Sequence, residues 1–182
     1  VQRQPTILNL SVQEKLEPNI AWLQDRLTLD EEGLQRVMLC LTPMVGGLAQ
    51  MLGSNMEENL EPTLVWLQER LLLDDAGIAK LVKKEASFLG FSLETLEERM
   101  AWLQKRLSLD DKSLSKLVGR LPAVLHYSVD DNLEPKLSWL QERLSLNDKS
   151  LSFVIQRMPS LFGLNIDNNL EPTIKFYEDC VG

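Results

Sequence analysis

The chain repeats one short segment at nearly constant spacing, and this repetition limits its fold more than any other feature. The triplet Trp-Leu-Gln occurs four times, each time followed two positions later by an arginine and then a leucine. A fifth copy begins at Leu170 and carries Phe176 in place of the tryptophan. One unit cannot bury its hydrophobic face alone, whereas stacked units can, so the repetition predicts an elongated solenoid. The tryptophans, which are 44, 36 and 37 residues apart, are Trp22, Trp66, Trp102 and Trp139.

Each unit opens with signals for the start of a helix. Seven residues before the tryptophan, or before Phe176, stands an Asn in three copies and a Thr in one, and both are good N-cap residues. A leucine, a glutamate and, in four copies, a proline come next, and a first turn tolerates proline and favours an acid. In the fourth unit we therefore expect a helix from Asn132 to about Leu144, with Trp139 as a core anchor between neighbouring units. The residues at this position are Lys15, Asn59, Thr95, Asn132 and Asn169, and all except Lys15 are predicted N-caps.

A second helix is predicted to begin eight residues after each tryptophan, at an Asp or Asn that is again a good N-cap. Its apolar residues recur at i, i+3, i+4 and i+7, as from Leu114 to Leu121, and form one hydrophobic face. A proline such as Pro122 or Pro159 then ends the helix. The short apolar segment that follows has the length of one 3₁₀ turn. The predicted N-caps of the second helices are Asp30, Asp74, Asp110 and Asn147.

The whole chain, residues 1–182, is predicted to form a single all-α repeat domain with a period of about 37 residues. Val1 to Pro5 match Ile155 to Pro159, which indicates that the chain begins late in a repeat. A transit peptide is not present in this chain, and that absence is uninformative because such a peptide would already have been removed. The units cover about 15–58, 59–94, 95–131 and 132–168, with partial units at 1–14 and 169–182.

Charge and composition narrow the classes of function. The formal net charge is −8 and the pI is about 4.8, whereas nucleic-acid-binding domains usually carry a basic excess. A local basic stripe is still compatible with an acidic total. No apolar run approaches the length of a membrane-spanning segment. Cys40 and Cys180 fit no metal-binding spacing and are expected to be unpaired thiols in a reducing compartment.

Catalytic chemistry has almost no support in the sequence. His126 is the only histidine and stands beside Tyr127, where a packing or hydrogen-bonding role is the simpler interpretation. The sequence has no glycine-rich phosphate loop, no metal-ligand cluster and no nucleophile motif. The chain is therefore predicted to be non-enzymatic, with no cofactor, no metal and no small-molecule substrate.

Three segments recur in a fixed order. They are Leu-Glu-Pro-x-hydrophobic-x-Trp-Leu-Gln-x-Arg-Leu, the helix start Leu-(Asp/Asn)-(Asp/Glu), and a closing Arg-x-Pro segment seen in Arg120-Leu121-Pro122 and Arg157-Met158-Pro159. Together they resemble the mTERF family, the mitochondrial transcription termination factor-like proteins, over essentially the whole chain. The resemblance implies a right-handed α-solenoid of helix, helix and short-helix repeats in an organelle, chloroplast or mitochondrion. It also implies binding of organellar DNA or RNA along the concave surface, in transcription, transcript maturation or ribosome assembly. The chain departs from the pattern in its acidity and at Ala86 and Glu98, which stand where proline is expected.

Two rows of basic residues recur with the units and are candidate phosphate contacts. The first row stands four residues after each tryptophan, near a helix end, where pairing with nearby acids is the alternative interpretation. The second row lies on the second helices, where cations four residues apart repel each other and favour an outside anion; a solvated face is the alternative. Phe153 replaces the basic residue in the fourth unit. The first row is Arg26, Arg70, Arg106 and Arg143, and the second is Arg36, Lys80, Lys84, Lys116, Arg120 and Arg157.

An insertion of about six residues follows Pro43 and is apolar, glycine-containing and methionine-bearing. This composition suits an adaptable contact with another protein, and a connector whose apolar residues pack into the core is the alternative. The candidate protein contacts are Met44, Val45, Leu48, Met51 and Leu52.

Two functions follow from these features. The acidity and the insertion favour a non-catalytic scaffold or binding subunit, with a protein partner in a larger organellar assembly. The family resemblance and the basic rows favour the alternative, an organellar nucleic-acid-binding regulator. Between the two, the net charge of −8 favours the scaffold, since any phosphate-binding surface must overcome it.

Overall fold

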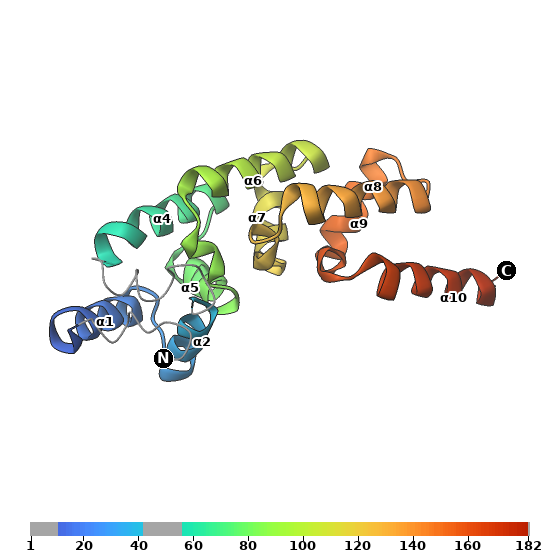
Figure 1. The fold of residues 1–182 in the computed structure, drawn as a ribbon. Coiled ribbons are helices and arrows are strands. Elements are labelled where there is room, and N and C mark those ends of the chain that lie inside the picture. Colours follow the sequence, from blue (N-terminus) through green and yellow to red (C-terminus); the bar gives the residue numbers. More distant parts are fainter. Residues whose placement is uncertain (1–10, 42–55, 182) are drawn as a thin grey trace.

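The described chain is a stack of helix pairs arranged in two rows (Figure 1). The computed structural model describes residues 11–41 and 56–181. The helices that carry the Trp-Leu-Gln segments and their fifth copy, termed the A helices, follow an arch, and the partner helices, termed the B helices, lie beneath it. The A helices are α1 (Glu17–Arg26), α4 (Met56–Leu71), α6 (Leu93–Leu107), α8 (Glu134–Arg143) and α10 (Glu171–Val181). The B helices are α2 (Glu31–Leu41), α5 (Asp75–Lys84), α7 (Asp111–Arg120) and α9 (Asp148–Arg157). The predicted all-α helical-repeat fold is confirmed.

The B helices begin where the sequence predicts. The carboxylate of Asp74 accepts a hydrogen bond from the backbone N–H of Gly77 at 2.7 Å, and Asp110 caps α7 in the same way through Ser113 at 2.8 Å. The predicted short third element is also present as one 3₁₀ turn in three units. Local cap and stop signals are therefore sufficient to define this half of the unit. The 3₁₀ turns cover Ser87–Gly90, Pro122–Leu125 and Pro159–Gly163.

The A-helix segments begin about one turn earlier than predicted. In the fourth unit the N-cap is Ser128, whose hydroxyl accepts from the N–H of Asp131, and not Asn132. A π-helical turn, Val129–Leu133, then leads into the proline-containing α8. Leu133 in this turn is fully buried, so packing on the core extends the helix past the local cap signal. The observed caps are Ser11, Ser92, Ser128 and Asn165.

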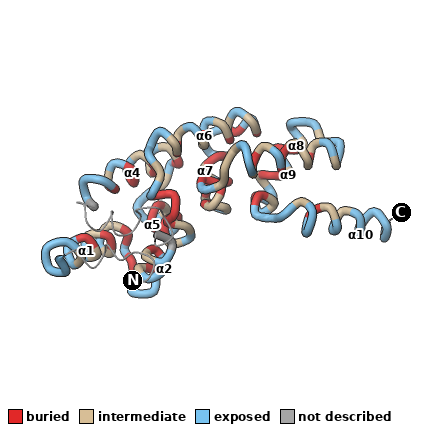
Figure 2. Tube along the Cα trace, in the orientation of Figure 1, coloured by how far each residue is buried: buried red, intermediate tan, exposed pale blue. Residues whose placement is uncertain are grey.

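The core lies between the two rows (Figure 2). The leucine after each tryptophan is buried in this core. The four tryptophans are half-buried and pack against this cluster from its edge. The tryptophans, predicted as core anchors, thus pack on the core without being fully buried in it, in keeping with the rule that so large a side chain is rarely fully buried. The leucines after the tryptophans, each at most 2% exposed, are Leu23, Leu67, Leu103 and Leu140.

Each of the first four A helices ends in the same tight turn, which sets the position of the following B helix. After α6, Ser108 adopts a left-handed conformation with φ of 50°, and the N–H of Leu109 bonds to the carbonyl of Gln104 at 2.9 Å. This is the hydrogen-bond pattern of a Schellman C-cap, formed without the usual glycine. The turn brings the start of α7 close to Gln104. The residues with positive φ are Thr28, Leu72, Ser108 and Ser145.

Candidate nucleic-acid interface

The first basic row joins each unit to the next. The Nε atom of Arg106, at the end of α6, donates to both carboxylate oxygens of Glu134 on α8, at 3.1 and 2.9 Å. Its Nη2 atom donates to the side-chain oxygen of Gln141 at 2.5 Å, and its Nη1 atom lies 3.8 Å from Asp148 at the start of α9. One guanidinium therefore holds both helices of the following unit.

This arrangement, termed the arginine clamp, occurs four times. Each clamp arginine contacts the glutamate that stands five residues before the tryptophan, or before Phe176, on the next A helix. Three of them also contact the glutamine of the next Trp-Leu-Gln triplet and the Asp that follows the next N-cap, whereas Arg143 meets Glu178 at the position of that glutamine. The sets are Arg26 with Glu61, Gln68 and Asp75; Arg70 with Glu97, Gln104 and Asp111; Arg106 with Glu134, Gln141 and Asp148; and Arg143 with Glu171 and Glu178.

Electrostatic pairing in the clamp favours the charged form of both partners. The hydrogen bond from Arg143 holds the pKa values of Glu171 and Glu178 below their ordinary range. The pKa of Asp75 is lowered first by its hydrogen bond from Gln68 and then by that from Arg26. The clamp arginine side chains are only 18–25% exposed. Their donors are thus engaged within the chain and do not form an open row.

Pairing with nearby acids, the alternative interpretation of this row in the sequence, is confirmed by contacts with an Asp of the neighbouring unit. Sequence reasoning missed the glutamate and glutamine partners. It assigned the glutamates to the first turn of the next helix, where they favour the helix dipole. The signal was nevertheless present, because Glu97, Glu134 and Glu171 follow the preceding clamp arginine by 27, 28 and 28 residues. A constant separation between opposite charges across a repeat boundary indicates contact between units.

The second basic row is exposed on the B helices and is termed the B-helix basic face. Lys84 on α5 donates from Nζ to the backbone carbonyl of Gly119 on α7 at 2.7 Å. Arg120 on α7 donates from Nη1 to the carbonyl of Gln156 on α9 at 2.8 Å. These two bonds link successive B helices and hold the cations at corresponding places along the row. The B-helix basic face consists of Arg36, Lys80, Lys84, Lys116, Arg120 and Arg157, all exposed.

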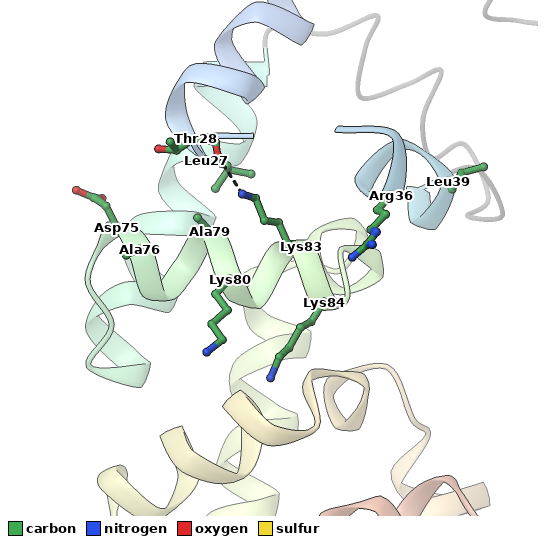
Figure 3. A pocket seen from close by; sticks show the side chains of 10 residues that line it. All are labelled: Leu27, Thr28, Arg36, Leu39, Asp75, Ala76, Ala79, Lys80, Lys83 and Lys84. Atoms are coloured by element: carbon green, nitrogen blue, oxygen red, sulfur yellow. Dashed lines mark hydrogen bonds between the residues drawn. The ribbon is translucent and has the colours of Figure 1, made fainter. Parts of the chain in front are cut away.

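A groove between α2 and α5 gathers four cations (Figure 3). Its volume is about 1070 Å³, and Arg36, Lys80, Lys83 and Lys84 line it. Lys83 is fixed by a hydrogen bond from Nζ to the carbonyl of Thr28 at 3.0 Å, drawn as a dashed line in Figure 3. A second open cavity of about 570 Å³ lies farther along the row and includes Arg120 and Arg157 in its lining. The cations of the B-helix basic face therefore border hollows that can accept a ligand group.

Acidic and basic residues are distributed unequally between the rows. The five A helices contain fourteen acidic and eight basic residues, whereas the four B helices contain nine basic and five acidic residues. Three of those five acids, Asp75, Asp111 and Asp148, are already paired with clamp arginines. The acidic excess of the chain therefore lies outside the B helices, whose own residues are basic in sum, although Asp30, Asp74 and Asp110 cap three of them.

Two further cations, the half-buried Arg99 and the buried Lys136, are engaged inside their own units. Arg99 donates to the backbone carbonyl of Leu125, and Lys136 donates to that of Phe162. Burial lowers the pKa of both side chains. Each binds the A helix of its unit to the end of the 3₁₀ turn, so these two residues are structural.

The remaining candidate residues give no second site. The proposed protein contacts Met44, Val45, Leu48, Met51 and Leu52 lie outside the described residues. His126 is exposed, and its ring lies 5.8 Å from that of Phe91. Cys180 is an exposed free thiol. Over residues 11–41 and 56–181, no group of three or more acidic, histidine or cysteine side chains could hold a metal ion, and none of the helices there has the length and apolarity to cross a bilayer.

The fold and the charge distribution define a helical-repeat binding protein whose row of B helices is basic. Comparison with protein families agrees with this class. The model of the mTERF family matches residues 1–106 and 48–181, which together span nearly the whole chain. The chain belongs to the mTERF family. A search of curated proteins gave no match.

Proposed function

We propose that this protein is an organellar nucleic-acid-binding regulator whose B-helix basic face contacts backbone phosphates. The observation that carries the proposal is the separation of charge between the two rows. A row of exposed cations repeated at the period of the fold matches a polymer with regularly spaced anions. Membership of the mTERF family supports both nucleic acid as the ligand and an organelle as the location. A role in transcription, transcript maturation or ribosome assembly would follow.

The cations of the B-helix basic face keep donors for a ligand. An ammonium group has three N–H donors and a guanidinium has five. Lys84 uses one donor on Gly119, and Arg120 uses one on Gln156. The remaining N–H donors belong to side chains that these bonds already hold in place. Phosphate binding would therefore cost little additional side-chain entropy.

The clamp arginines are poor phosphate ligands by comparison. A phosphate at Arg106 would have to displace Glu134 and Gln141, and it would leave those partners without their donor. We therefore assign Arg26, Arg70, Arg106 and Arg143 to stacking of the units. The scaffold interpretation, which rests on the insertion after Pro43, has no described contact in its favour and stays a prediction.

The direct test is charge reversal on the B-helix basic face. We expect Lys84→Glu with Arg120→Glu to abolish binding of DNA and RNA strands in fluorescence anisotropy across a salt series. Because both residues also bond to neighbouring helices, Lys80→Glu with Lys116→Glu provides a second variant on exposed positions. The wild type should show a steep loss of affinity with salt, and any binding that a variant retains should have a shallower slope because fewer counterions are released.

The matched control applies the same charge change to the A row. Lys15, in the turn Val12–Leu16 that leads into α1, and Lys105 on α6 are exposed, and Lys15→Glu with Lys105→Glu lowers the net charge by the same amount. If net charge alone governed binding, the control would lose as much affinity as the test variants. Loss in the test variants only would support the proposal. Absence of binding by the wild type at low salt would reject it and favour the scaffold.

A further inference from the structure

One aromatic side chain stands among the cations of the B-helix basic face. Phe153 on α9 occupies the position held by Lys80 on α5 and Lys116 on α7. Residues four apart lie on one face of a helix, so Phe153 lies between Lys149 and Arg157, which are both exposed. The corresponding face of α7 has three cations, Lys112, Lys116 and Arg120.

Folding does not explain why a phenylalanine occupies this position. The side chain of Phe153 is 63% exposed, and it does not belong to the core cluster or to the residues packed against it. The other strongly exposed aromatics among the described residues are Phe176 and Tyr177 on α10, whose rings contact each other at 6.1 Å between centroids. Phe153 instead presents an apolar ring within a basic surface.

We propose that Phe153 is a stacking platform for an unpaired base, which gives the B-helix basic face a preference for single-stranded nucleic acid. This inference rests on the proposed function. Phosphates on either side of the base would contact Lys149 and Arg157, with Arg120 available across the cavity that it shares with Arg157. Alternating cations and aromatic rings are the arrangement by which proteins hold single strands with little sequence preference.

The geometry of the nucleic acid explains the preference. Every base of a single strand has a π-face that can lie on an aromatic ring. In a duplex both faces of each base are covered by its neighbours, and a protein reaches only the base edges and the backbone. Phe153 would therefore add affinity for unpaired strands alone, whereas the cations serve both forms.

The test compares Phe153→Leu with the wild type on four labelled probes: oligo-dT, oligo-U, a mixed-sequence duplex and an abasic strand of the same length. We expect binding of the two unpaired strands to weaken roughly five- to twentyfold, as for loss of one stacked base. Affinity for the duplex and the abasic strand, which offer phosphates without an accessible base face, should not change. Equal affinity of both proteins for oligo-dT and oligo-U would overturn the inference.

Phe153→Lys separates stacking from phosphate contact at the same position. It restores the residue type of α5 and α7. If the position only contacts phosphate, this variant will bind every probe more tightly, and the inference is wrong. If Phe153 stacks, the variant will bind the duplex and the abasic strand more tightly than the wild type does. Its affinity for oligo-dT and oligo-U will not rise to the same extent, because the stacking contact is lost. Phe176→Leu, a change at an equally exposed phenylalanine outside the B row, is the matched control and should leave all affinities unchanged.

The failure of this inference is distinguishable from failure of the proposed function. Loss of affinity on charge reversal, with no effect of Phe153→Leu, would overturn stacking and retain phosphate binding. Absence of wild-type binding to every probe would overturn both. A strand carrying 2-aminopurine gives a readout that a structural role would not affect, since stacking on the ring changes its fluorescence and Phe153→Leu should abolish that change.

Discussion

The arginine clamp should supply a measurable part of the stability of the stack, and Arg106→Met tests this. Methionine keeps much of the apolar stem but removes every donor of the guanidinium. The change removes the paired contact with Glu134 and the contact with Gln141. The ion pair with Asp148 spans 3.8 Å and the Asp148 side chain is 78% exposed, so this pair contributes almost nothing to stability.

The expected magnitude follows from these contacts. A hydrogen bond to a charged group contributes about 1.5 to 3 kcal/mol. The clamp has two such contacts, and partial exposure of Arg106 at 21% and of Glu134 at 38% reduces their sum. We expect the free energy of unfolding to fall by about 2 to 3 kcal/mol, which lowers Tm by about 5 to 10 °C for a chain of this size. The urea transition should also broaden, because stacked units unfold together only while their interfaces hold.

The assay is urea denaturation followed by circular dichroism, with Arg157→Met as the control. Arg157 is an exposed arginine on α9 outside the clamp, and its substitution should change stability by less than about 0.5 kcal/mol. A double-mutant cycle with Glu134→Gln should give a coupling energy of about 1 kcal/mol or more. If Arg106→Met is no more destabilising than Arg157→Met, the clamp does not hold the units together and the reasoning is refuted.

Three further predictions follow from the same geometry. Arg143 lowers the pKa values of Glu171 and Glu178 in the folded chain. The stability that these two carboxylates contribute is therefore complete above their unfolded pKa of 4.5 and is lost as the pH falls through their lower folded values. At pH values below about 4.5 the urea concentration at the unfolding midpoint should decrease, and Arg143→Gln should weaken this pH dependence. Leu72→Gly should stabilise the chain by about 0.5 to 1 kcal/mol in thermal unfolding, because glycine adopts the left-handed conformation without strain; a lower Tm would contradict it. Ser152→Ala should destabilise it by about 1 to 2 kcal/mol, because the buried hydroxyl donates to a carbonyl of the preceding unit; a change below about 0.5 kcal/mol would mean that this bond is not needed.

Features that depend on neighbouring residues were predictable from the sequence. Asp110 caps α7 as predicted, and Pro122 begins the following 3₁₀ turn. The start of α8 was not predictable in the same way, because both Ser128 and Asn132 are good N-caps and the proline favours the later one. Burial of Leu133 against the core decides between them. That contact joins distant parts of the chain and has no local signal.

The candidate site shows the same limit. The two basic rows look alike in the sequence, since each recurs in all four units. Only the partners distinguish them: Arg70 meets Glu97 of the next unit, whereas Lys84 meets a backbone carbonyl and remains exposed. Phe153 was visible as a break in the second row, but its exposure, which suggests a role for it, required the structure.

Net charge is a poor guide to the partner of an elongated repeat protein. At physiological ionic strength the field of an exposed charge is largely screened beyond about 8 Å. In a stack of helix pairs the acids of the A row therefore contribute little to the potential above the B row, although the A helices carry fourteen of the 27 acidic residues of the chain. Three of the acids on the B row are also neutralised locally by clamp arginines. A ligand approaching the B row thus meets the nine basic residues of these helices, and the acidic total that favoured a scaffold in the sequence does not oppose phosphate binding there.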